Sequence, residues 1–158
     1  VSGDGKPSSS ASIGLLIEEA VLNYMDSFNA SLQNHFNDMF ENGREVAISI
    51  KMTNNCPIAL SDDVEFMGET VQLQDILDYW MDENTVGRRF SRANAGDNFI
   101  DYEQVRIPLY KTVLGKERAI DARGFAVDLG KFLNKEPFNL PYKIYERGLG
   151  NVWIVIGE

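Results

Sequence analysis

The sequence contains few of the residues from which metal sites and catalytic sites are usually built. Cys56 is the only cysteine, so no intrachain disulfide and no zinc site of several thiolates can form. His35 is the only histidine, which excludes every site that needs two imidazoles. The motifs Gly-x-x-x-x-Gly-Lys-Ser/Thr, Gly-x-Ser-x-Gly and His-Glu-x-x-His do not occur. We therefore expect no catalytic residue and no cofactor, although the enzyme question stays open.

Long hydrophobic runs are also missing. A bilayer span needs roughly 20 apolar residues, and the longest candidate, residues 13–21, is interrupted by Gly14, Glu18 and Glu19. No basic segment precedes an apolar stretch as it does in a signal peptide. We expect no membrane span. A removed leader or a further upstream part is compatible with the small, polar residues at the start.

What the sequence has is a substantial apolar fraction. Hydrophobic residues make up 44% of its 158 residues, enough for one domain with a core that needs no disulfide. Residues 1–12 (VSGDGKPSSSAS) are rich in Gly, Ser and Pro and are typical of a flexible linker. We expect a single domain over residues 13–158.

The charges are unevenly distributed along the chain. Residues 1–86 hold three basic and fifteen acidic residues, whereas residues 87–158 hold twelve basic and nine acidic residues. Such a division suits binding to an oriented partner, head-to-tail self-association, or two faces of one domain that pair with each other. If it drives association, that association should weaken at high salt.

Hydrophobic periodicity predicts three helices and several strands. The first helix covers residues 13–42, with a break expected near Ser27–Ser31, and its apolar stripe predicts that Phe28 and Phe36 are buried. A second helix is predicted from a Thr70 cap to Glu83, and a third over Ala122–Asn134 with Asp121 as its cap. Strands are predicted at 45–53, around 64–66, at 102–111, and in a closing hairpin of 142–146 and 152–156.

This order of elements, α-β-(β)-α-β-α-β-β, defines the predicted fold. We expect an α+β protein with a layered antiparallel or mixed sheet on which three helices pack. Residues 84–98 are polar and predicted to be irregular. Pro108 removes a donor from its strand and so places that strand at an edge or a bulge.

Two charged segments are the candidate sites. Asp62, Asp63 and Glu69 lie in an acidic loop whose oxygen atoms suit a hard cation, although the spacing of an EF-hand is absent and a solvated loop is the plainer interpretation. The segment Arg88-Arg89-Phe90-Ser91-Arg92 combines basic residues with an aromatic one, as nucleic-acid-binding segments do. The acidic composition makes nucleic acid an unfavoured partner and favours ion pairing of this segment within the domain.

His35 and Cys56 are the two further residues with catalytic potential. His35 has Asp38 three residues on, and a histidine held by a carboxylate is one part of a catalytic triad. His35 could in principle activate Cys56 as a nucleophile. No local motif supports this, and structural roles for both residues are the simpler interpretation.

One further observation concerns segments 18–21 with 28–29, 36–40 with 42–46, 102–110 and 147–150. These segments resemble a family of exported proteins of unknown function from Bacteroidota. The resemblance implies a C-terminal domain of a longer, envelope-associated protein, in the periplasm or cell envelope, and it brings no active site. A looser similarity, at the level of the fold alone, is to small ring-building and periplasmic assembly modules.

The leading hypothesis is therefore a non-catalytic interaction or assembly module that binds a protein partner or itself. The first alternative is a metal-dependent hydrolase that uses Asp62, Asp63 and Glu69. The second is nucleic-acid binding through Arg88, Arg89 and Arg92.

Overall fold

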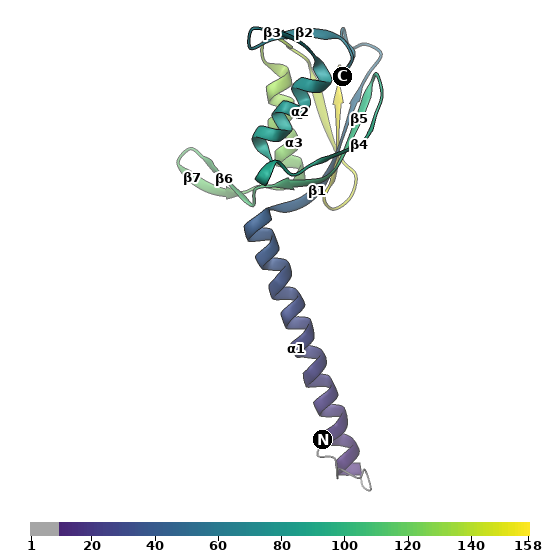
Figure 1. Ribbon diagram of the computed structural model, residues 1–158, viewed down its shortest axis with the longest axis vertical. Helices are drawn as coiled ribbons and strands as arrows, with labels where there is room; N and C mark the ends of the chain where they lie inside the picture. Colours follow the sequence, from purple (N-terminus) through teal and green to yellow (C-terminus); the bar gives the residue numbers. More distant parts are fainter. Residues whose placement is uncertain (1–9) are drawn as a thin grey trace. The chain divides into compact units, whose positions relative to one another are not determined.

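A computed structural model describes residues 10–158 of the protein (Figure 1). Most of the predicted linker, residues 1–9, lies outside the described residues, and residues 10–12 belong to the first helix. The chain divides into two compact units, one that ends at Asp38 and one that covers Met39–Glu158. That residues 13–158 fold as a single domain stays a prediction.

The helix α1 (Ser10–Asn42) is continuous over 33 residues, about 50 Å at 1.5 Å per residue. The predicted break near Ser27–Ser31 is wrong. The burial predicted for Phe28 and Phe36 is also wrong, since they are 55% and 43% exposed. An apolar stripe indicates a buried face only where another surface covers it. The exposed large apolar residues of α1 are Ile13, Leu15, Ile17, Val21, Leu22, Tyr24, Met25, Phe28, Leu32, Phe36 and Phe40.

Gly43 ends this helix as the sequence predicted. Its φ of +83° is the left-handed conformation of a helix C-terminus, and its amide donates to the Met39 carbonyl at 2.9 Å. A Cβ at Gly43 would lie 2.5 Å from the carbonyl oxygen of Ile107. Glycine is therefore required here both for the backbone conformation and for the close approach of a neighbouring strand.

A five-stranded mixed sheet forms the centre of the unit 39–158, in the order β4-β5-β1-β9-β8 (Figure 1). The central strand β1 pairs antiparallel with β5 and parallel with β9. The predicted α+β class and order of elements are confirmed. The strands of the sheet are β1 (Arg44–Met52), β4 (Ser91–Ala95), β5 (Phe99–Ile107), β8 (Tyr142–Glu146) and β9 (Asn151–Ile156).

One face of the sheet is buried because its strands alternate in polarity. In β1 the side chains of Val46, Ile48, Ile50 and Met52 are buried, as their period of two predicts. In β5 the alternation is interrupted by a bulge at Gln104, which has a positive φ of 51°. The extra residue allows side chains on both sides of the bulge to point into the core.

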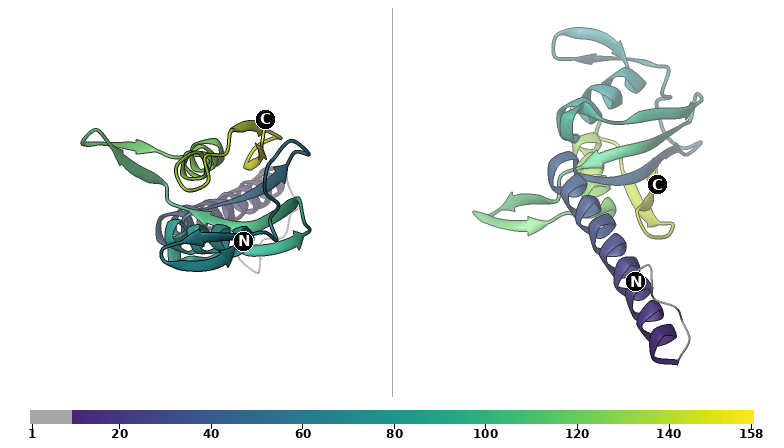
Figure 2. Two further views of the ribbon diagram at one scale, coloured as in Figure 1. Left: turned by 90° about the horizontal axis from the view of Figure 1, so that it is seen from above. Right: turned by 60° about the horizontal axis from the view of Figure 1, so that its bottom comes forward.

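Two helices, α2 (Leu73–Asn84) and α3 (Ala122–Asn134), lie side by side on the buried face of the sheet (Figure 2). Trp80 of α2 contacts Phe125 of α3 edge-on, with ring centroids 5.1 Å apart. Asp121 caps α3 as predicted, since its carboxylate accepts from the Gly124 amide at 2.7 Å. None of the helices among residues 10–158 combines the length and hydropathy that a bilayer span requires.

Two separate hairpins complete the unit. The first joins β2 (Asp63–Phe66) to β3 (Glu69–Gln72), and the second joins β6 (Tyr110–Val113) to β7 (Lys116–Ala119). The β6–β7 hairpin extends away from the sheet and helices in each view (Figures 1 and 2). The strand predicted at 102–111 is thus two strands, with Pro108 between them.

Two local predictions are wrong. Thr70 does not cap α2 but lies in β3, where its hydroxyl donates to the carboxylate of Glu65. The amides of Leu73 and Gln74, at the start of α2, instead donate to the carbonyls of Asp62 and Leu60 at 3.1 and 3.0 Å. The second error is β4, an edge strand within the predicted irregular segment 84–98, whose mostly exposed side chains do not alternate in polarity.

The burial of the aromatic residues gives a stability prediction. Phe125→Ala should lower the free energy of unfolding by about 3–5 kcal/mol, because Phe125 is buried against Trp80. Phe28→Ala should change it by less than about 1 kcal/mol, because Phe28 is exposed. Urea unfolding of both variants measures the difference, and equal losses would contradict the assignment of the core.

Candidate functional site

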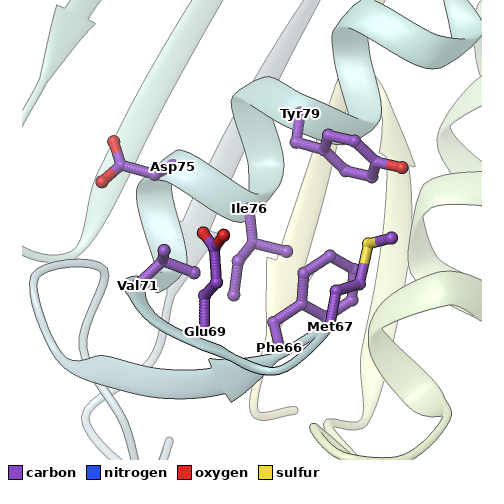
Figure 3. Close-up of a pocket in the computed structure, with 7 residues that line it drawn as sticks. All are labelled: Phe66, Met67, Glu69, Val71, Asp75, Ile76 and Tyr79. Carbon is purple, nitrogen blue, oxygen red and sulfur yellow. The ribbon is translucent and has the colours of Figure 1, made fainter.

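A pocket of about 300 Å³ lies between the β2–β3 hairpin and the first turns of α2 (Figure 3). Phe66 and Met67 come from the hairpin end of β2, Val71 from β3 and Ile76 from α2. Their side chains converge on one space, with Tyr79 above it (Figure 3). The volume is at the lower end of the range for ligand sites, which suits one or two side chains rather than a large cofactor.

Phe66 holds the floor of the pocket in place through ring contacts. Its ring lies edge-on to Phe132 at 6.0 Å, 5.8 Å from the ring of Phe138 and 5.9 Å from that of Tyr79. Phe132 is only partly buried and packs against the core. Aromatic rings in these arrangements gain attraction beyond their buried area. The floor is therefore fixed by contacts that continue into the core.

The rim of the pocket is negatively charged. Glu69 and Asp75 are exposed at its edge and the ring of Tyr79 reaches it from α2. None of the seven residues that line it is basic. An apolar floor beside two carboxylates suits a ligand with an apolar group next to a positive charge.

The acidic loop is not organised as a metal site. Asp62 accepts the Ala59 amide at 2.8 Å, Asp63 pairs with Gln72 in the β2–β3 hairpin, and Glu69 lines the pocket. No group of three His, Cys, Asp or Glu side chains among residues 10–158 is placed to hold a metal ion. The site predicted at Asp62, Asp63 and Glu69 stays a prediction without support from this geometry.

The basic segment is divided between the surface and the interior. Arg88 and Arg89 are exposed at the end of a short helical turn (Val86–Arg88), whereas the ring of Phe90 packs edge-on against Tyr102 at 5.7 Å. Arg92 forms an ion pair with Asp78. The ion pairing expected for this segment is confirmed for Arg92. Nucleic-acid binding through Arg88, Arg89 and Arg92, and protein contact through these residues with Phe90, stay predictions.

Arg92, Asp78 and Tyr102 form one polar network between α2 and the sheet. The Tyr102 hydroxyl donates to Asp78 Oδ1 at 2.7 Å, and Arg92 contacts Asp78 Oδ2 and lies 3.4 Å from both oxygens of Gln74. Burial, reinforced by the hydrogen bond and the negative charge of Asp78, raises the pKa of Tyr102 well above its ordinary value. The network joins α2 to the edge strand β4.

Cys56 is half-buried and packs against the core as a free thiol, which agrees with its structural interpretation. His35 is exposed on α1, with its ring 6.3 Å from that of Phe36. The two residues belong to different units of the chain. The described contacts assign neither of them a catalytic role.

Sequence reasoning missed the pocket, although one signal for it was present. Met67 is a large apolar residue at the tip of the β2–β3 hairpin. It is 75% exposed and lies on the edge of the pocket. An apolar side chain at an exposed hairpin tip is not buried by its own fold and adds little to its stability. Its presence in the sequence is therefore a signal for a binding surface.

The raised pKa of Tyr102 predicts a loss of stability at alkaline pH. The folded protein keeps the phenol neutral, so its contribution is complete below the unfolded pKa of about 10 and is lost as pH rises above it. Above pH 10 the free energy of unfolding should therefore fall more steeply for the wild type than for Tyr102→Phe. Denaturant unfolding between pH 8 and 11 measures both slopes, and parallel slopes would contradict the assignment.

Comparison with known proteins places the compact unit in a family. Residues 44–157 match a family described as a domain of unknown function (DUF6175). The match covers every strand and the helices α2 and α3, and it begins immediately after Gly43, so α1 lies outside it. No curated protein and no solved structure matches the chain. The sequence-based recognition of a domain of unknown function is confirmed, and the chain belongs to the DUF6175 family.

Proposed function

We propose that the protein is a non-catalytic interaction module that self-associates through the apolar stripe of α1. The observation that carries the proposal is the exposure of eleven large apolar side chains along one helix. Exposed apolar surface of this extent is typical of a surface that another protein covers. A helix longer than 25 residues with a sustained apolar stripe is typical of helices that pair with other helices.

The area of the stripe matches what a stable dimer needs. Tyr24, Phe28, Phe36 and Phe40 are between 43% and 72% exposed. A covered aromatic side chain buries roughly 150–250 Å², so these four alone offer on the order of 400–500 Å². The seven exposed aliphatic side chains bring the total close to the roughly 800 Å² per partner of a standard interface.

The charges of α1 favour an antiparallel pair of helices from two copies. The helix carries five acidic residues and no lysine or arginine. A parallel pair in register would bring each acidic residue near its own copy, and like charges at such positions are destabilising. An antiparallel pair separates Glu18 of one helix from Glu18 of the other.

The test compares oligomeric state in solution. Phe28→Gln with Phe36→Gln should remove the association that α1 mediates, seen as a smaller assembly by sedimentation velocity, with little change in unfolding, because both side chains are exposed. Asn23→Gln with Asn34→Gln, on the opposite face of α1 by helical position, is the matched control and should leave the dimer intact. A wild-type protein that is monomeric at about 100 μM would contradict self-association and direct attention to a different protein partner.

The setting proposed for this module is the envelope of a bacterium. Its support is the resemblance to exported proteins from Bacteroidota in segments 102–110 and 147–150, which lie within the family match. Fractionation of cells that express the full-length gene tests the setting. Recovery of the protein in the cytosol alone would remove this part of the proposal and leave the interaction module unaffected.

A further inference from the structure

The tip of the β6–β7 hairpin carries an apolar residue where the backbone favours a different residue type. Leu114 and Gly115 both have positive φ, 54° and 75°, as in the two-residue turn of type I′ for which Asn-Gly and Asp-Gly are preferred. Leucine at φ near +54° is disfavoured by its Cβ. Its side chain is 95% exposed, so burial within the chain does not compensate for this conformation.

The hairpin is held firmly at its base. Lys111 Nζ donates to both carboxylate oxygens of Asp128 in α3, at 3.1 and 2.9 Å. The Ile120 amide donates to the Leu109 carbonyl at 2.9 Å and closes the base of the hairpin. The tip beyond these contacts is exposed, with Lys116 two residues after Leu114 and Arg118 on the same side of β7, while Glu117 lies between them on the other side.

The pocket between β2–β3 and α2 is complementary to this tip. Its floor is apolar, its rim carries Glu69, and Asp75 lines it at the start of α2 with its carboxylate directed outward (Figure 3); none of the residues that line it is basic. Its volume of about 300 Å³ is suited to a single large side chain with room around it. A leucine next to a lysine is the combination that an apolar floor and an anionic rim would bind.

A hairpin tip cannot reach the pocket of its own chain. Both figures show β6–β7 projecting from one end of the unit 39–158 and β2–β3 at a different end (Figures 1 and 2). The two complementary surfaces are therefore available only to separate copies. A contact of one surface with a different surface on the next copy is heterologous, and it repeats into a chain or a ring.

We propose that Leu114 and Lys116 of one copy bind the pocket of another, with Leu114 on the Phe66 floor and Lys116 beside Glu69 and Asp75. This contact goes beyond the pairing of α1 helices and uses none of its residues. It pairs a basic residue of the second half of the sequence with two acidic residues of the first half, in agreement with the uneven distribution of charge along the chain.

The experiment isolates this contact by using the full chain with Phe28→Gln and Phe36→Gln as the background. Sedimentation velocity should show association that depends on concentration and weakens between 0.1 M and 1 M salt. Leu114→Asn should raise the dissociation constant about tenfold or more, as expected for the central residue of an interface. Because asparagine suits the turn better than leucine, this loss cannot result from unfolding. Leu149→Asn, at another fully exposed turn, is the matched control and should change nothing.

A charge exchange and a mixing experiment complete the test. Lys116→Glu and Glu69→Lys should each weaken association, and the two substitutions in one chain should restore it. The Leu114→Asn variant keeps an intact pocket, and the Glu69→Lys variant keeps an intact hairpin. A mixture of the two variants should therefore form complexes of two copies and no larger assemblies.

Two outcomes would overturn the proposal. One is a chain with Phe28→Gln and Phe36→Gln that stays monomeric at about 1 mM, and the other is unchanged association when Leu114→Asn is added to it. Neither outcome affects the proposed role of α1, because the α1 substitutions are tested against the wild-type chain. Conversely, a wild-type chain that α1 substitutions leave unchanged would remove the helix pairing and leave the contact of hairpin and pocket intact.

Discussion

The central position of β1 is the constraint on which the rest of the structure depends. Its buried residues, from Val46 to Met52, form the middle row of the core. Its two edges are both occupied, by β5 in antiparallel pairing and by β9 in parallel pairing. A one-residue slip of β1 would turn its whole apolar set to the other face and disturb both neighbours. The positions of α2, α3 and the pocket follow from this one register.

The bulge at Gln104 links that register to the polar network. It changes the phase of β5 so that Tyr102 and Val105, three residues apart, both point into the core. The Tyr102 hydroxyl therefore lies beneath α2, where it donates a hydrogen bond to Asp78. Asp78 also forms the ion pair with Arg92 of the edge strand β4. A large buried ring with one polar atom needs such a partner. The network thus connects a buried side chain of the core, Tyr102, to the partly exposed ion pair of Asp78 and Arg92.

Much of the fold could be predicted from periodicity, because patterns of two and of 3.6 are imposed by burial on one side. The strand β1, the helix α3 with its Asp121 cap and the closing hairpin were predicted for this reason. The edge strand β4 was missed because a strand with mostly exposed side chains has no alternation to detect. Thr70 was misplaced because a threonine before an apolar run is equally suited to a cap and to a strand.

The candidate sites were harder to predict, for a different physical reason. Charge clusters in the sequence, such as Asp62 with Asp63 or Arg88 with Arg92, report composition along the chain and not distance in space. The pocket depends on Phe66, Ile76 and Tyr79, which come from separate elements and meet only after the hairpin packs on α2. The amphipathic pattern of α1 was correctly recognised, but the pattern is the same for a helix that faces its own core and one that faces a partner.

The parallel pairing of β1 with β9 has a consequence for synthesis of the chain. Ala47 is the partner of Asn151, so the central strand waits for nearly all of the following sequence before its second edge is filled. Contacts of such long sequence separation form slowly, because the loop they close costs entropy first. Until residues 151–156 have left the ribosome, the edge of β1 that pairs with β9 keeps its backbone N–H and C=O groups unpaired, and such an edge can pair with another chain. The pairing of β1 with β9 is thus among the last contacts of the sheet to form as the chain is synthesised.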